Sequence, residues 1–135
     1  MSANAKKRSK SARLTARQMV GQRGEQLAAD KLGASGYSIV ERNYRCAEGE
    51  IDIVARHGEV WAFVEVRTRR GRAFGSPEES ITARKKAHLI AAAQSYLQAH
   101  NIADANWRID VAAVEFNAKG HLIRVDLIEN AVNEQ

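Results

Sequence analysis

GEIDIVARHGEVWAFVEVR, residues 49–67, decides the fold of this 135-residue chain. Two apolar runs flank a short polar segment, which is the pattern of two β-strands joined by a tight turn. We predict a hairpin with a two-residue turn at His57-Gly58. The second strand is apolar on both faces from Val60 to Val64, which is typical of a strand in the middle of a sheet.

Three carboxylates gather along this predicted hairpin. In its register, Asp52 lies opposite Phe63. Glu50 lies opposite Glu65, and Arg67 projects from the same face because side chains alternate along a strand. Asp52 and Glu65 are then diagonal neighbours, roughly 7 Å apart at the backbone. Two carboxylates at that spacing can share a divalent cation that takes oxygen ligands.

A plainer interpretation is an edge cluster of compensating charges. Glu65 and Arg67 lie two positions apart and can form a solvated ion pair that contributes little stability. However, Ile51 and Ile53 flank Asp52, and the apolar run leads directly into Glu65. Carboxylates at the end of a buried strand are costly unless they are paired or bound to a metal. We therefore expect a functional site here.

Hydrophobic periodicity predicts helix, three strands, helix and two strands in a single domain, residues 15–130, followed by a tail over residues 131–135. We expect an α/β fold with a mixed sheet of about five strands flanked by helices. The first helix should aim Glu25 towards the sheet. The second long helix should bury Leu89, Ala92, Ala93, Tyr96 and Leu97. The predicted elements are the helix Thr15–Ser35, the strands Tyr37–Arg45, Glu50–Arg56 and Glu59–Arg69, a helix start at Ser76-Pro77-Glu78-Glu79, the helix Thr82–His100, and the strands Trp107–Glu115 and Leu122–Leu127.

Positive charge is concentrated at the N-terminus. The formal net charge is +5, yet residues 1–24 hold seven basic residues and no acid, so the other 14 bases and 16 acids leave the remainder slightly acidic. We expect residues 1–14 to be a disordered basic arm that contacts phosphates through Lys6, Lys7 and Arg8. A disordered, solubilising tail is the alternative.

A second group of basic residues follows the carboxylate strand and opens the next predicted helix. Cations gain nothing from the helix dipole at an N-terminus, so an anionic ligand explains them better than helix stability does. A solvated charged face is the alternative. Positive charge flanking the carboxylates suits a phosphodiester brought to a metal. The group comprises Arg67, Arg69, Arg70, Arg72, Arg84, Lys85 and Lys86.

Composition argues against several other classes of protein. No apolar run approaches the ~18 residues of a transmembrane helix, and no apolar segment follows the basic start as in a secretory signal. We therefore expect no association with a membrane. The single cysteine, Cys46, allows no internal disulfide and fits a reducing, cytoplasmic compartment. The four histidines lack the spacing of zinc ligands.

Five motifs, in order and with matching spacing, resemble the YraN-like family of small bacterial proteins. The resemblance covers nearly the whole chain beyond the arm, from about Val20 to Leu127. It implies the restriction-endonuclease-like fold of the PD-(D/E)xK superfamily. The motifs are Gly21-x-x-Gly24-Glu25, Asn43-Tyr44-Arg45, Gly49-Glu50-Ile51-Asp52, Phe63-Val64-Glu65-Val66-Arg67-Thr68-Arg69 and Trp107-Arg108-Ile109-Asp110-Val111.

The same resemblance implies roles for the carboxylates. Asp52 corresponds to the first acidic metal ligand, Glu65 to the second, and Glu25 to an additional glutamate on the first helix that completes the metal shell directly or through water. Arg67 stands where the superfamily usually has lysine. The implied cofactor is Mg²⁺ or Mn²⁺, and the implied activity is hydrolysis of phosphodiester bonds in nucleic acid. DNA, including branched or processed intermediates, is the expected substrate.

The arginine in the lysine position affects the chemistry that we expect. Arg67 stays protonated and cannot act as a general base, although it can stabilise charge on the phosphate. The attacking water would then be activated by the metal. Asp110, on a later strand, could line the site or pair with Arg108, and we favour the structural pairing.

Two interpretations without catalysis stay open. The chain could be a nucleic-acid-binding module on a nuclease-like scaffold, because fold does not determine function. It could also serve protein interaction or assembly. Glu25, Asp52 and Glu65 are all present, which argues against a decayed site. Nucleic acid is the expected partner, and a homodimer with two sites about a two-fold axis would explain cutting of paired strands.

Overall fold

The structure is a computed structural model that describes residues 13–73 and 75–132. Helices and strands follow the predicted order. None of the helices in these two ranges is both long and apolar enough to cross a bilayer. The elements are α2 (Ala16–Ala34), β1 (Tyr37–Cys46), β2 (Gly49–His57), β3 (Val60–Arg70), the short 3-10 helix η1 (Glu78–Ser80), α3 (Ala83–Ala99), β4 (Trp107–Phe116) and β5 (Leu122–Val132).

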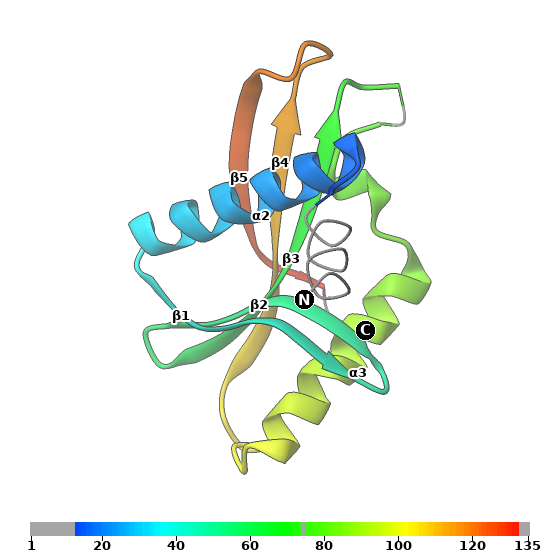
Figure 1. Ribbon diagram of the computed structural model, residues 1–135. Helices are drawn as coiled ribbons and strands as arrows, with labels where there is room; N and C mark the ends of the chain where they lie inside the picture. Colours follow the sequence, from blue (N-terminus) through cyan, green and yellow to red (C-terminus); the bar gives the residue numbers. More distant parts are fainter. Residues whose placement is uncertain (1–12, 74, 133–135) are drawn as a thin grey trace, which may run out of the picture.

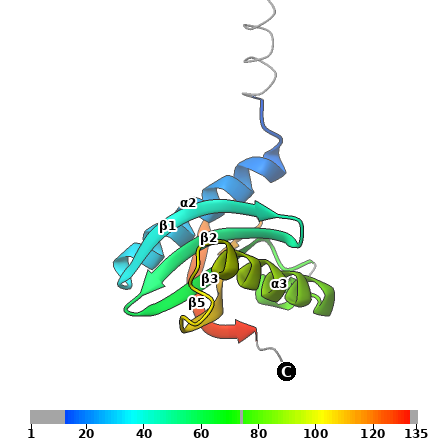
Figure 2. The same cartoon turned by 90° about the horizontal axis from the view of Figure 1, so that it is seen from below.

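The five strands form one mixed sheet in the order β1-β2-β3-β4-β5. Neighbouring strands are antiparallel except β3 and β4, which are parallel. A parallel pair needs a crossover connection, and α3 lies within it. The β1–β2 hairpin bends away from β3, β4 and β5 (Figure 1), and the two long helices cover opposite faces of the sheet (Figure 2). This confirms the expected α/β fold, and it is compatible with a restriction-endonuclease-like fold.

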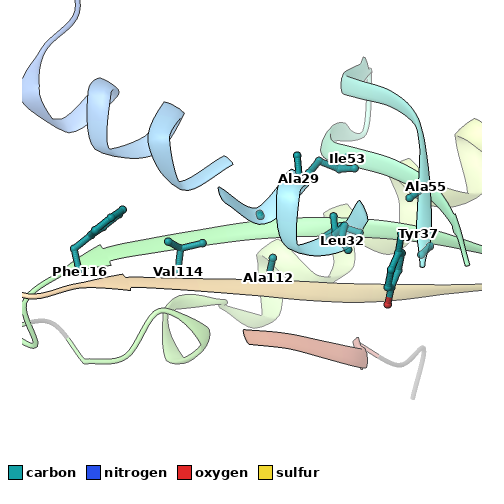
Figure 3. Packing of buried hydrophobic residues seen from close by; sticks show 11 residues of the cluster. Ala29, Leu32, Tyr37, Ile53, Ala55, Ala112, Val114 and Phe116 are labelled. Atoms are coloured by element: carbon teal, nitrogen blue, oxygen red, sulfur yellow. The ribbon is translucent and has the colours of Figure 1, made fainter. Parts of the chain in front are cut away.

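Helix α2 begins at a capping box and packs through small residues. The hydroxyl of Thr15 accepts a hydrogen bond from the Gln18 N–H, and the Gln18 side chain accepts one from the Thr15 N–H. Its buried face lies on apolar side chains of β2, β3 and β4 (Figure 3). The residues of this cluster are Ala28, Ala29, Leu32, Tyr37, Ile53, Ala55, Ala62, Val64, Ala112, Val114 and Phe116.

Helix α3 covers part of the opposite face. Thr82 caps it by accepting a hydrogen bond from the Lys85 N–H at 3.1 Å. The five residues predicted to face inward are all buried, as expected from their helical spacing. They pack against Ile51, Val54, Phe63 and Ile109.

The hairpin register differs from the predicted one by one step. His57 pairs with Val60, so the two-residue turn is Gly58-Glu59 rather than His57-Gly58. Gly58 has φ +64, and a two-residue turn of type II′ requires that conformation at its first central position. The shift moves each strand by one residue. Ile53 packs with the cluster on the α2 side and Ile51 with the cluster on the α3 side, so the regular alternation of β2 that the predicted shared face requires breaks around Asp52. The shift also brings Asp52 directly opposite Glu65 instead of diagonal to it.

Some element ends also differ from the prediction. Strand β5 continues to Val132, so the tail expected from residue 131 is still strand at its start. The predicted helix start at Ser76 is the short helix η1, where the Ser76 hydroxyl donates to Glu79 Oε1 at 2.6 Å. Most of the predicted arm, residues 1–12, lies outside the described residues.

Candidate functional site

The candidate site lies where the ladder between β2 and β3 ends. The last backbone pair is Ile53 with Val64. Asp52 is the next residue of β2, and the continued register places it opposite Glu65. Asp52 Oδ2 accepts a hydrogen bond of 2.8 Å from the N–H of Val66. The Asp52 side chain therefore binds a β3 amide at the point where β2 leaves the ladder.

The two facing carboxylates are shielded from solvent. The side chain of Glu65 is only 3% exposed. Burial raises the pKa of Asp52 from its ordinary value of 3.8 to about 8, and the facing Glu65 carboxylate contributes to the rise. The Val66 N–H opposes this effect, because it stabilises the charged form. At neutral pH the folded protein therefore favours the protonated form of Asp52.

Glu25 approaches the pair from α2. Its negative charge contributes to the raised pKa of Asp52, although less than Glu65 does. Its Oε1 atom accepts hydrogen bonds from Arg42 of β1, at 3.2 Å from Nε and 3.1 Å from Nη2. The predicted orientation towards the sheet is therefore observed, with the carboxylate bound to an arginine.

The close approach of α2 depends on Gly24. A Cβ at this position would lie 2.1 Å from Oγ1 of Thr68 on β3. Only a residue without a side chain allows the helix backbone to approach β3 so closely. Gly24 therefore sets the depth at which the neighbouring Glu25 enters the site.

All three nitrogen atoms of the Arg67 guanidinium donate hydrogen bonds. Nη1 donates to Glu65 Oε2 at 3.2 Å, and Nε donates to the hydroxyl of Ser80 at 2.8 Å. Nη2 donates to the Ser80 carbonyl oxygen at 3.5 Å. Arg67 therefore ties η1 to the carboxylate strand. Sequence reasoning did not identify Ser80, because nothing in the local pattern indicates a contact across thirteen positions.

Lys85 lies in the site rather than on the outer surface of α3. Its Nζ atom is 3.6 Å from Glu65 Oε2. The sequence grouped Lys85 with Arg84 and Lys86 as one phosphate-binding cluster. In the structure the two neighbours are exposed, and neither makes an ion pair with any other described residue.

The other basic residues predicted to contact phosphate lie in different surroundings. Arg70 Nε donates to the Ala118 carbonyl oxygen at 3.1 Å. Arg69 lies on the same face of β3 as Glu65, and its Nε atom is buried without a hydrogen-bond partner among the described residues. Arg72 forms an ion pair with Glu115, a buried carboxylate of β4. Lys6, Lys7 and Arg8 lie outside the described residues.

Glu115 belongs to a network that sequence reasoning missed. Its Oε1 atom accepts from Arg124 Nε at 2.8 Å, and Arg124 Nη2 donates to Glu78 Oε1 at 2.8 Å. These arginine contacts, with that of Arg72 first, hold the pKa of Glu115 below its ordinary value. The network fastens η1 to β4 and β5, so the segment that carries Ser80 is held at both ends.

Two further carboxylates serve structural roles. Glu50, predicted to share the face of the site, lies 3.7 Å from Arg45 Nε on the neighbouring strand. Asp110 accepts hydrogen bonds from Arg108 Nε at 2.9 Å and from the Tyr37 hydroxyl at 2.8 Å. Asp110 therefore makes the structural pairing with Arg108 that the sequence favoured.

The donor set suits a hard divalent cation held by few protein ligands. Within residues 13–73 and 75–132, no three His, Cys, Asp or Glu side chains are grouped as a metal site. Asp52 and Glu65 are the facing pair, while the nearby Glu25 is engaged by Arg42. Mg²⁺ usually keeps several waters and binds through one or two carboxylates. The residues therefore fit such an ion through two carboxylates, with Glu25 within electrostatic reach of Asp52.

Comparison with known proteins shows the family of the chain. Residues 24–114 match the family described as "Uncharacterised protein family UPF0102". The UPF0102 protein of Dehalococcoides mccartyi is 47% identical over 119 residues, covering 88% of this chain and 97% of that protein. The UPF0102 protein of Symbiobacterium thermophilum is 48% identical over 112 residues, covering 83% of this chain and 94% of that protein.

A solved structure also aligns with the chain. SfsA of Pyrococcus furiosus, determined in complex with Ca²⁺, matches with a TM-score of 0.37 and 15% sequence identity. The alignment covers 87% of this chain and 65% of that one. The family match spans all four residues around the carboxylate pair, namely Glu25, Asp52, Glu65 and Arg67. The chain belongs to the uncharacterised protein family UPF0102, the YraN-like family that its five motifs indicated.

Proposed function

We propose that this protein is a Mg²⁺- or Mn²⁺-dependent nuclease of the PD-(D/E)xK superfamily, which hydrolyses phosphodiester bonds in nucleic acid, with DNA as the expected substrate. The observation that supports this most is the facing of Asp52 and Glu65 where β2 leaves β3. Burial and mutual repulsion make this pair costly without a cation between the two groups. A structural ion pair would not need two acids facing one another.

Each residue of the site has a distinct task. Asp52 and Glu65 would hold the ion through carboxylate oxygens. Glu25 adds negative charge from α2, either directly or through an ordered water. Arg67 keeps a permanent positive charge beside Glu65 and fixes its rotamer. When bound, the cation lowers the pKa of the attacking water and neutralises charge on the phosphate.

The reaction consumes one water for each bond cut. The water oxygen forms a new bond to phosphorus, and the bond from phosphorus to the leaving oxygen breaks. The water loses a proton, and the leaving oxygen ends as a hydroxyl. Arg67 cannot accept the proton, because its guanidinium stays charged. The proton therefore leaves to solvent or to a group other than Arg67.

A cleavage assay tests the proposal. Labelled single-stranded, duplex and four-way-junction DNA would be incubated with wild type, with and without Mn²⁺. We expect metal-dependent cutting that Asp52→Asn lowers at least a hundredfold, because one of two metal ligands is lost. Glu50→Gln is the matched control, since this partly exposed carboxylate two positions away pairs with Arg45. It should cut as wild type does.

Two outcomes would contradict hydrolysis at this pair. Cutting by Asp52→Asn at the wild-type rate would show that the activity lies elsewhere or comes from a contaminant. Salt-sensitive binding without cutting on any substrate would favour the binding module. The same preparations would be tested on RNA, so that the class of nucleic acid is decided in one experiment.

A further inference from the structure

Two cations reach Glu65 from different elements. Arg67 comes from β3 itself, with Nη1 at 3.2 Å from Oε2. Lys85 comes from the first turn of α3, with Nζ at 3.6 Å from the same oxygen. Only one of the two cations can move onto a substrate phosphate without breaking contacts other than the one with Glu65.

Arg67 is the less available of the two cations. Beyond Glu65, its Nε and Nη2 atoms bind the hydroxyl and carbonyl oxygens of Ser80. Its side chain is 28% exposed. Moving the guanidinium onto a phosphate would release η1 from β3, so these contacts suit a positioning residue.

Lys85 is the more available of the two cations, because it has fewer other contacts. Its side chain is 36% exposed, and Glu65 is its one ionic partner among the described residues. An ammonium group has three N–H donors on a flexible stem, so it can change partner without disturbing the backbone. Its place on the first turn of α3 opposes the helix dipole, so the carboxylate, and not the helix, accounts for its orientation.

We infer that Lys85, rather than Arg67, is the cation that contacts a non-bridging phosphate oxygen of bound nucleic acid. The inference rests on the proposed function in that it takes Glu65 as a ligand of a divalent cation. Once such an ion neutralises Glu65, Lys85 no longer needs that carboxylate and turns to the phosphate. Position 67 holds an arginine, and the lysine beside Glu65 comes from α3 instead.

The test measures binding separately from cutting. Fluorescence anisotropy of a labelled DNA duplex in Ca²⁺ gives the dissociation constant for wild type, Lys85→Gln, Lys85→Arg and Lys86→Gln. We expect Lys85→Gln to weaken binding about tenfold, because one ion pair with a phosphate is removed. Lys86→Gln, on the exposed side of the same turn, should change it less than threefold. Lys85→Arg should restore most of the affinity, because it keeps the charge.

The outcomes separate this inference from the proposed function. If wild type binds but never cuts in Mn²⁺, and Lys85→Gln still binds about tenfold worse, hydrolysis fails and the Lys85 contact stands. If Lys85→Gln binds like Lys86→Gln and cuts like wild type, Lys85 is overturned and hydrolysis stands. Wild type that binds none of the DNA substrates of the cleavage assay, and no RNA, overturns both. Failure of Lys85→Arg to restore affinity also overturns the contact, and thermal melts of each variant identify weakening that comes from unfolding.

Discussion

At the scale of single residues, Asp52 shows how tertiary surroundings change a side chain. In the sequence it is one aspartate between two isoleucines. In the structure it faces Glu65, and burial together with repulsion between the two carboxylates favours its protonated form at neutral pH. A divalent cation and a proton therefore compete for the same oxygens.

This competition predicts how stability depends on pH. Between about pH 4 and about pH 8, the folded protein retains a proton on Asp52 that the unfolded chain has released. The folded state binds more protons, so the free energy of unfolding falls as pH rises through that window. Asp52→Asn removes this contribution. In EDTA, we expect Tm to fall more from about pH 5 to about pH 8 in wild type than in the variant.

Two controls accompany these melts. Glu50→Gln should keep the wild-type dependence on pH, because Glu50 lies beside Arg45 and outside the pair. Mn²⁺ added at about pH 8 should raise the Tm of wild type and leave that of Asp52→Asn nearly unchanged, since a ligand stabilises only the state that binds it. Identical pH slopes for wild type and Asp52→Asn would contradict the raised pKa of Asp52.

At the scale of secondary-structure elements, the site depends on how closely α2 packs on β3. The helix carries two glycines within its first turns, which lower helix propensity in the free chain. Packing requires glycine at only one of these two positions. A Cβ on Gly24 would meet Thr68, whereas a Cβ on Gly21 would have no atom within 4 Å.

The two glycines should therefore respond oppositely to alanine. Gly24→Ala should destabilise the protein by about 1–3 kcal/mol, because α2 or Thr68 must move. Gly21→Ala should stabilise it by up to about 1 kcal/mol, because alanine is the better helix former. Chemical denaturation measures both. The cost of Gly24→Ala should shrink in a Thr68→Ala background, and an unchanged cost would show that Thr68 is not the obstacle.

At the scale of the whole molecule, charge is divided between the described domain and the N-terminal arm. Within the domain, several cations near the site are already paired with carboxylates, as Arg72 is with Glu115. The first twelve residues add four bases and no acid. Long-range attraction to nucleic acid should therefore come largely from the arm, and the site should supply the specific contacts.

Removal of residues 1–12 tests this division. We expect the slope of log K against log salt to decrease by about 0.9 for each phosphate that the arm no longer neutralises, with little change in Tm. A full-length variant with Lys6, Lys7, Arg8 and Lys10 changed to glutamine is the matched control, because it keeps the length of the chain. If both proteins keep the wild-type slope, the arm does not contact phosphate.

Local pattern was sufficient for the elements themselves. Spacing of apolar residues predicted the inward face of α3 residue by residue, because helical periodicity is a property of the chain alone. The turn of the hairpin was misplaced by one residue. Both placements put Gly58 in a two-residue loop, and only the turn type, set by the twist of the paired strands, selects between them.

The sequence by itself determined the order of elements, the mixed sheet, the family motifs and the placement of Asp52 and Glu65 on neighbouring strands. These depend on periodicity and strand alternation, which act over a few residues. Only the tertiary structure decided which cation stands beside which acid. In the structure, Ser80 contacts Arg67, Arg42 contacts Glu25 and Lys85 contacts Glu65. Such contacts join positions far apart in the chain, and their partners are chosen by how closely the helices pack on the sheet and where β2 leaves β3.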